Sequence, residues 1–187
     1  MQYYFDLEAL PNPQIAQVDV VAQLMQQAHA QLPQYLGRVG LSFPEYRTEK
    51  TLGRIIRVFA NDKDLTDLHS SIKANPRFSN YCTVGEVLHA PEEPEAYTCF
   101  VRVQPKGNSR LQRLKRRHQA KGTWTNEFEQ EVEKKYATKE QLPHVSLRSI
   151  SNGQKFILFV KQEKRPQSTE GFFSSYGLSN TTTVPWF

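Results

Sequence analysis

The spacing of apolar residues in the first ninety positions restricts this chain to a mixed fold of strands and helices. Tyr3, Phe5 and Leu7 alternate with Tyr4, Asp6 and Glu8, which is the period-two pattern of a strand. A helical apolar face then runs from Val18 to Leu32, and Asn61 is suited to cap a second helix with acids in its first turn. The predicted order is a strand at 3–8, the first helix, strands at 39–43 and 55–60, the second helix and a strand at 81–88.

This β-α-β-β-α-β order is typical of the ferredoxin-like fold, which also underlies RNA-recognition (RRM-like) domains. We therefore predict an α+β protein whose N-terminal ferredoxin-like domain spans residues 1–95. Residues 96–187 are predicted to form a second domain, a degenerate ferredoxin-like half. Many unrelated proteins share this fold, so the order of elements alone predicts no function.

The second half contains a further strand, two helices and a hairpin. Asn108 and Ser109 are suited to begin a helix that Gly122 would stop, and Asn126 with Glu129 resembles a capping box for the next helix. Asn-Gly at 152–153 is a signal for a tight hairpin turn. The predicted elements are strand 97–104, helices near 110–121 and 127–136, hairpin strands 145–150 and 155–160, a loop at 165–171 and a strand at 172–178.

The charge of the chain is concentrated in one segment. The net charge is +5, but residues 102–121 hold eight Lys and Arg and no acid, and the remainder has 16 bases against 19 acids. One stripe of the predicted helix collects Arg110, Arg113, Arg117 and Lys121. A solvated helix face paired with the acidic 127–133 region is the alternative, but such faces usually mix both signs. The segment therefore favours binding of a polyanion, most often nucleic acid.

Several classes of protein are excluded by what the sequence lacks. Two cysteines without a CxxC pair exclude a disulfide framework and a zinc ribbon. There is no apolar run long enough for a membrane span and no secretory signal pattern, so a reducing, cytoplasmic location is expected. No phosphate-binding glycine loop, acidic metal cluster or Ser-His-Asp spacing appears. A nuclease of this kind would have to work without metal, which RNA permits because its 2′-OH can act as the nucleophile.

The candidate site residues each have an ordinary structural interpretation as well. Arg102 and Gln104 share one strand face and could bind guanine and adenine edges, although an exposed Arg/Gln pair is common. His29, near the end of the first helix, is suited to proton transfer but also to a favourable contact with the helix dipole. The remaining candidates could serve turn chemistry or packing, or else bind RNA: Ser149, Ser151, Asn152, Phe156 and Tyr176.

Taken together, these residues resemble the type I-F CRISPR repeat-processing endoribonucleases, the Csy-type family. The resemblance extends over residues 1–187 and rests on His29, RVQ, an Arg-rich helix ending in RRH, RSISNGQKF, SSYGLS and a final VPWF. It implies a metal-independent endoribonuclease without a cofactor. Such an enzyme binds the stem-loop of a CRISPR repeat transcript and cuts at the 3′ base of the stem. The 2′-OH attacks, leaving a 2′,3′-cyclic phosphate and a 5′-OH.

The resemblance also implies a role for each candidate residue. His29 is the catalytic histidine, Ser149 holds the ribose that supplies the nucleophile, and Tyr176 helps to place His29 or the RNA. Arg102 and Gln104 read base edges of the lowest stem pairs, and Phe156 stacks under the base at the foot of the stem, with Ser151 nearby. RNA contacts along the groove are expected from Arg110, Arg113, Arg116, Arg117 and His118.

The family's enzyme stays on its product and joins the crRNA-guided surveillance complex, so other subunits of that complex are expected partners. The residues leave open whether His29 acts as base toward the 2′-OH or as acid toward the leaving 5′-oxygen. Two other functions fit the same pattern. One is a non-catalytic subunit that caps an RNA hairpin, and the other is a structural ribonucleoprotein subunit with generic RNA affinity.

Overall fold

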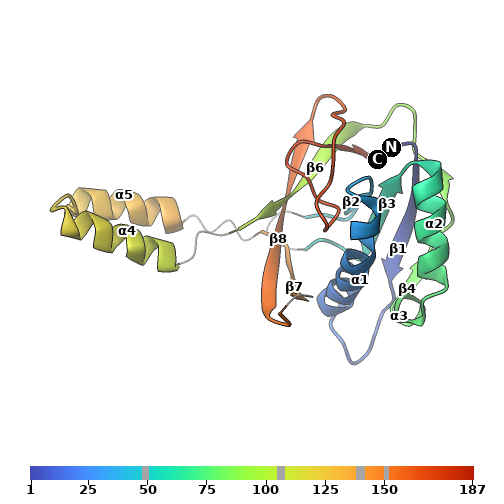
Figure 1. The fold of residues 1–187 in the computed structure, drawn as a ribbon, viewed down its shortest axis with the longest axis horizontal. Coiled ribbons are helices and arrows are strands. Elements are labelled where there is room, and N and C mark those ends of the chain that lie inside the picture. Colours follow the sequence, from blue (N-terminus) through green and yellow to red (C-terminus); the bar gives the residue numbers. More distant parts are fainter. Residues whose placement is uncertain (48–50, 105–107, 138–141, 150–151) are drawn as a thin grey trace. The chain divides into compact units, whose positions relative to one another are not determined.

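The computed structural model describes residues 1–47, 51–104, 108–137, 142–149 and 152–187. It divides into two compact units. Residues 1–103 and 142–187 form the first, which holds both sheets, and residues 104–141 form the second. In chain order the elements are β1 (Tyr3–Ala9), α1 (Gln17–Gln31), the 3-10 turn η1 (Leu32–Tyr35), β2 (Gly40–Ser42), β3 (Ile55–Ala60), α2 (Asp62–Lys73), α3 (Pro76–Ser79), β4 (Cys82–Val84), β5 (Leu88–His89), β6 (Ala96–Val103), α4 (Asn108–Ala120), α5 (Asn126–Ala137), β7 (His144–Arg148), β8 (Lys155–Arg165) and β9 (Val184–Trp186) (Figure 1).

The first sheet is antiparallel and has the strand order β2-β3-β1-β4, with β5 added beside β1. Its strands and helices follow the order predicted from the apolar spacing, and β3 has the predicted bounds. Phe5 and Leu7 of β1 point into the core and are fully buried. The predicted α+β class is therefore confirmed.

Asn61 caps α2 as predicted and also joins a small polar network. Its side-chain oxygen accepts from the backbone N–H of Asp64 at 2.8 Å. The Asp64 carboxylate receives two hydrogen bonds from Arg38, at 2.6 and 3.1 Å. These bonds from Arg38 are the main reason why the pKa of Asp64 lies below its usual value.

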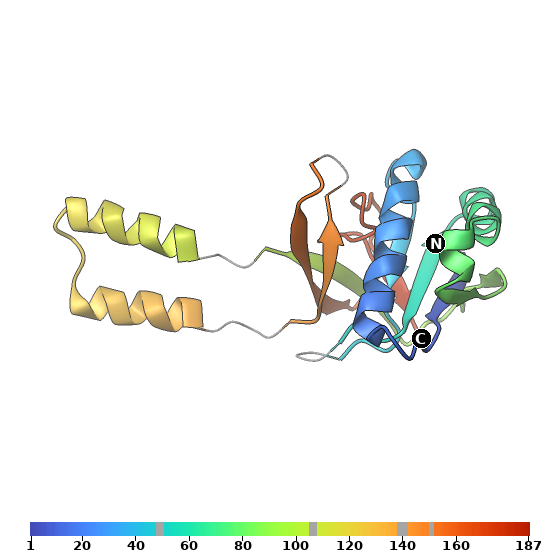
Figure 2. The ribbon, with the colours of Figure 1, turned by 90° about the horizontal axis from the view of Figure 1, so that it is seen from below.

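The second sheet is antiparallel as well, in the order β7-β8-β6-β9. Helix α1 lies between the two sheets (Figure 2), and buried residues of both sheets belong to one hydrophobic core. The predicted domain boundary after residue 95 thus falls between two sheets that share a core, while the compact units divide after 103 and 141.

The second unit is a hairpin of two helices, α4 and α5. His118 packs on Phe128 with 4.8 Å between ring centroids, and Trp124 packs edge-on to the same ring at 5.5 Å. Gly122 has φ +67°, so it ends α4 as predicted. The predicted capping box is wrong, because α5 is capped by Thr125, whose hydroxyl accepts from the Phe128 N–H at 3.2 Å.

Two predicted strands are not formed as continuous strands. The 81–88 run is broken into β4 and β5, because the register against β1 shifts by one residue between Val84 and Leu88. The backbone at this bulge is still satisfied: the Gly85 N–H donates to the Asp6 carbonyl of β1 at 2.8 Å, and the Gly85 carbonyl lies 2.8 Å from Nε2 of His69 on α2. The strand predicted at 172–178 is an irregular segment with a turn, and β8 instead extends through residue 165 into the predicted loop.

Among the described residues, no helix combines the length and the apolar character that crossing a membrane requires.

Candidate active site

His29 lies in the last turn of α1, where two contacts from one irregular segment fix its ring. The ring stacks on Tyr176 with centroids 3.9 Å apart and planes 10° apart. Its Nδ1 lies 2.7 Å from the backbone carbonyl oxygen of Ser175. A carbonyl carries no hydrogen, so Nδ1 must be the donor in this bond. In the neutral ring the lone pair is then on Nε2, which can accept a proton.

The segment that holds His29 is a turn closed by its own backbone. Ser174 N–H donates to the Leu178 carbonyl, and Gly177 N–H donates to the Ser174 carbonyl, both at 2.8 Å. Gly177 has φ +69°, which side-chain-bearing residues rarely adopt. Its carbonyl accepts from Leu41 N–H at 2.8 Å, which ties the turn to the region of β2. These bonds help to explain why 172–178 is not a strand, since its donors and acceptors are used within the turn, by the Leu41 N–H and by the Gly37 carbonyl, which accepts from the Phe173 N–H at 2.8 Å.

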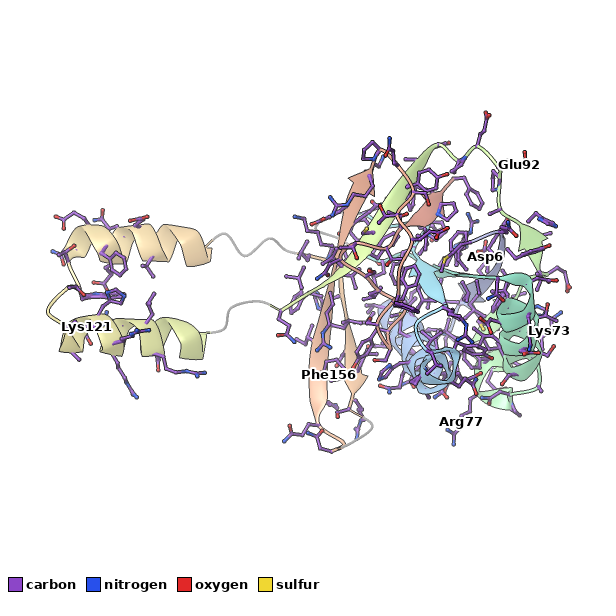
Figure 3. The ribbon with its side chains drawn as sticks, turned by 45° about the horizontal axis from the view of Figure 1, so that its top comes forward. Asp6, Lys73, Arg77, Glu92, Lys121 and Phe156 are labelled. Atoms are coloured by element: carbon purple, nitrogen blue, oxygen red, sulfur yellow. The ribbon has the colours of Figure 1, made fainter. Side chains whose placement is uncertain are left out.

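Arg102 and Phe156 complete a cluster around Tyr176. The guanidinium carbon of Arg102 lies 5.1 Å from the Tyr176 ring centroid and 5.6 Å from that of Phe156. Phe156 meets Tyr176 edge-on, with centroids 6.1 Å apart, and lies at the start of β8 near the hairpin turn (Figure 3). Four residues predicted from sequence, His29, Arg102, Phe156 and Tyr176, are therefore neighbours although they come from four different segments.

Ser149 belongs to the hairpin that is held against α1. Its N–H donates to the Gln154 carbonyl at 2.9 Å, and its carbonyl accepts from Gly153 N–H at 2.8 Å. The Arg148 N–H donates to the side-chain oxygen of Gln26 at 2.7 Å, and Gln26 lies three residues before His29 on α1. Gln26 was not predicted from sequence, because a glutamine on a half-buried helix face gives no sign of a partner on a distant strand.

The other hairpin candidates differ in what the structure shows. Asn152 has the turn chemistry expected of its residue type, because its side-chain oxygen accepts from Gln154 N–H at 3.1 Å. Ser151 lies outside the described residues.

The basic helix α4 separates its cations onto different faces. Arg113, Arg116 and Arg117 are exposed. Lys115 instead contacts Glu129 of α5, and this ion pair lowers the pKa of the Glu129 carboxyl. His118 is also on the α5 side, where its Nδ1 lies 2.9 Å from the Thr123 hydroxyl.

Two further RNA-binding candidates are placed only by their backbone or exposure. Arg110 lies in α4, with its side chain outside the described part, and Gln104 is exposed just after β6. Among the described residues, no three His, Cys, Asp or Glu side chains gather as metal ligands would. The described site thus offers an oriented imidazole, an arginine and two aromatic rings.

Comparison with known proteins identifies the family. A family model described as CRISPR-associated protein (Cas_Csy4) matches residues 4–187. A curated protein of Escherichia coli (strain UTI89 / UPEC), named CRISPR-associated endonuclease Cas6/Csy4, is 33% identical over 192 residues and 100% of both chains. A protein of the same name from Pseudomonas aeruginosa (strain UCBPP-PA14) is 33% identical over 195 residues, again covering 100% of both chains. The resemblance found in the sequence is therefore confirmed, and the chain belongs to the Cas_Csy4 family of CRISPR-associated proteins.

Proposed function

We propose that this protein is a metal-independent endoribonuclease that binds the stem-loop of a CRISPR repeat transcript and cuts at the 3′ base of the stem. The observation that carries the proposal is the oriented imidazole of His29, held by the Ser175 carbonyl and the Tyr176 ring. Relatives that match the whole chain are named CRISPR-associated endonucleases, which supports the same class of activity.

The proposed reaction uses a nucleophile that the RNA itself supplies. The 2′-OH of the nucleotide before the cut attacks the adjacent phosphorus while the bond from phosphorus to the 5′-oxygen breaks. The products are a 2′,3′-cyclic phosphate and a 5′-OH. His29 acts as the base through Nε2, because Nδ1 already donates to Ser175. Ser149 orients the attacking ribose, the leaving 5′-oxygen takes a proton from solvent water, and the proton accepted by His29 returns to solvent, so the proton count balances.

The residues clustered around Tyr176 are suited to position the foot of the RNA stem beside His29. We assign to Phe156 the stacking of the base at the foot of the stem, and to Arg102 and Gln104 the reading of nearby base edges. Phe156 and His29 both contact Tyr176, so a base stacked on Phe156 would place the neighbouring phosphate close to the imidazole. This proximity is what an intramolecular attack requires.

Helix α4 is assigned the electrostatic part of RNA binding. Its exposed Arg113, Arg116 and Arg117 contact phosphates along the groove, and Arg110 is assigned the same role. His118 contributes through the packing of the helix hairpin, since its ring lies against Phe128. Ser151 is assigned to the foot of the stem together with Phe156.

The finer architecture and the assembly belong to the same proposal. We infer that residues 1–95 are a ferredoxin-like domain with the catalytic His29, and that 96–187 are a degenerate ferredoxin-like domain that binds RNA. The antiparallel order β2-β3-β1-β4 supports the first assignment. After cleavage the protein stays on its hairpin and joins the type I-F surveillance complex as a subunit.

The test is cleavage of the repeat hairpin in EDTA. Wild-type protein should cut, whereas His29→Ala should still bind the hairpin but fail to cut, because the proton acceptor is lost while the residues assigned to RNA binding on α4 and β8 remain. His144→Ala is the matched control, since this exposed histidine lies on β7 and should be dispensable for cutting. A 2′-deoxy nucleotide before the cut should block cleavage without loss of affinity.

Three results would contradict the proposal: cutting by His29→Ala, cutting of the 2′-deoxy substrate, or a need for added magnesium. Binding without any cutting by the wild-type protein would support the alternative function, a subunit that only caps an RNA hairpin.

A further inference from the structure

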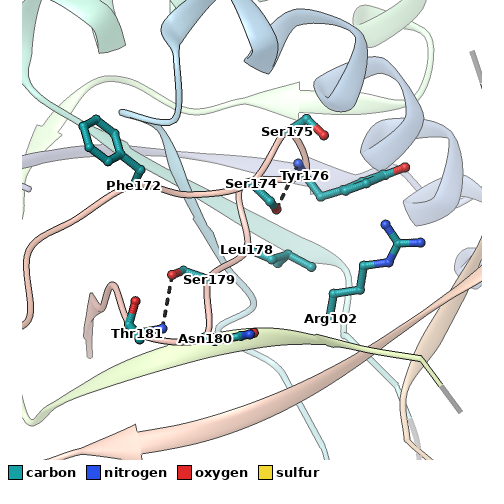
Figure 4. Close-up of a pocket in the computed structure, with 9 residues that line it drawn as sticks. All are labelled: Arg102, Phe172, Ser174, Ser175, Tyr176, Leu178, Ser179, Asn180 and Thr181. Atoms are coloured by element: carbon teal, nitrogen blue, oxygen red, sulfur yellow. Dashed lines mark hydrogen bonds between the residues drawn. The ribbon is translucent and has the colours of Figure 1, made fainter. Parts of the chain in front are cut away.

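A pocket with a volume of about 490 Å³ opens next to the catalytic cluster. Arg102 and Tyr176 form the wall that it shares with that cluster, and the other lining residues include Phe172, Ser175, Asn180 and Thr181 (Figure 4). Ligand-binding pockets commonly have volumes of about 300–1,000 Å³, so this one can accept a group of the size of a nucleotide.

The lining of the pocket has the chemistry that a nucleotide needs. The residue Phe172 is 74% exposed, an unusual state for one with a large apolar ring and one suited to stacking on a base. In the described part of the chain no hydrogen bond engages the Asn180 amide group or the hydroxyls of Ser175 and Thr181. These groups can donate to or accept from base edges, and the Arg102 guanidinium can offset phosphate charge.

The position of the pocket indicates which nucleotide it would take. The hairpin with Ser149 is tied to α1 at Gln26, and the turn with Ser175 is tied to it at His29. Three residues of helix separate these two attachments by about 4.5 Å along the axis. A phosphate at His29 whose upstream ribose meets Ser149 therefore has its downstream nucleotide on the side of Ser175, where the pocket opens.

We propose that this pocket binds the first nucleotide on the 3′ side of the cut, with its base stacked on Phe172. The inference rests on the proposed function, because it takes its direction from the roles of His29 and Ser149. Its consequence is that the uncut transcript makes a contact which the product hairpin cannot make. The pocket then releases the downstream fragment after cleavage while the hairpin stays bound through α4 and Phe156.

The experiment compares three RNAs that carry a 2′-deoxy nucleotide before the cut, so that none is cleaved. One ends at the cut, one extends a single nucleotide beyond it, and one extends by an abasic residue. Wild-type protein should bind the one-nucleotide extension at least about fivefold more tightly than the RNA that ends at the cut, as expected for one stacked base. The abasic extension should show no such gain.

Phe172→Ala should abolish the gain and leave the affinity for the RNA that ends at the cut unchanged, a pattern that misfolding would not produce. Leu88→Ala is the matched control, because Leu88 is a large apolar residue that is 51% exposed on β5 and does not line the pocket. A gain that persists in Phe172→Ala, or no gain in the wild-type protein, would overturn the pocket assignment.

A parallel cleavage reaction with an all-ribose repeat in EDTA separates the two proposals. If the wild-type protein cuts but shows no gain from the extra nucleotide, the pocket assignment alone is wrong. If it does not cut at all, the proposed function fails and the assignment of the pocket fails with it.

Discussion

Gly177 is the position where one added methyl group should displace the turn at 174–178, which holds the His29 ring, relative to the rest of the fold. The residue has φ +69°, and a Cβ built there would overlap the Leu41 side chain, with Leu41 Cδ1 at 3.1 Å. Gly177 also accepts the Leu41 N–H and follows directly on Tyr176. Gly177→Ala must therefore move the turn that carries the Ser175 carbonyl and the Tyr176 ring.

The cost to stability can be divided by comparison with Gly153, which also has φ +69° but has no atom within 4 Å of a built Cβ. A left-handed backbone costs a residue with a side chain about 1–2 kcal/mol in both variants. Only Gly177→Ala adds overpacking, at about 1–3 kcal/mol. With about 2–4 °C per kcal/mol for a chain of this size, Gly177→Ala should melt about 2–12 °C below Gly153→Ala.

In Gly177→Ala the cleavage rate should be affected more strongly than the stability of the fold, because a displacement of about 1 Å in a catalytic group can reduce the rate about 100-fold. The assay is single-turnover cleavage of the repeat hairpin at saturating protein, at a temperature where Gly177→Ala is folded by circular dichroism. Equal melting temperatures for the two glycine variants, together with wild-type cleavage by Gly177→Ala, would refute the argument that Leu41 and this turn position His29.

Three further predictions concern separate parts of the molecule. Arg116→Gln should reduce the slope of log affinity against log salt by about 0.9, so that raising the salt from 50 to 200 mM costs about 3.5-fold less affinity than in the wild-type protein. Lys115→Gln, on the α5 side, should leave the slope unchanged. Equal slopes for the two variants in filter-binding titrations would reject this assignment. Gln26→Leu should slow single-turnover cleavage while Gln26→Glu preserves it, because only glutamate still accepts the strand N–H; equal losses would argue against this positioning role. The lowered pKa of Asp64 contributes stability that is present above its unfolded pKa of about 4 and is lost as the pH falls through the folded pKa. Asp64→Asn should therefore reduce the free energy of unfolding by about 1 kcal/mol at pH 7, a small value because Arg38 is partly exposed. In a plot of melting temperature against pH, the variant should show a flatter slope on the acid side.

The elements that could be predicted from sequence are those with a face in the core. The period of two at Tyr3, Phe5 and Leu7 and the helical face from Val18 to Leu32 reflect burial, and burial is what fixes β1 and α1. The segment 172–178 has similarly spaced aromatic and apolar residues, but its backbone hydrogen bonds are made within a turn and to Gly37, Leu41 and the His29 ring. The spacing of apolar residues does not predict which group will form a hydrogen bond with a given backbone N–H or carbonyl.

The sequence predicts which residues belong to the candidate site, but it does not predict how they are arranged in space. His29 and the Ser175 carbonyl are 146 positions apart in the chain, so no local spacing could have brought them together. Tyr176 stacks on His29, and its role in placing His29 or the RNA stays a prediction. The contact of Gln26 could not be predicted from sequence, because its partner is a backbone N–H, a group that every residue except proline has.

The distribution of charge separates attraction of RNA from the chemistry proposed for it. Residues 104–141 contain ten Lys and Arg and five Asp and Glu, so their net charge of +5 equals that of the whole chain, and the unit that carries His29 is neutral overall. Long-range attraction of a polyanion must then depend mainly on the helix hairpin, while the neutral unit acts through short contacts such as stacking and the bond to Ser175. Raising the salt concentration should therefore weaken binding strongly and leave the cleavage rate of bound RNA almost unchanged, because an oriented imidazole in contact with its substrate is little affected by screening.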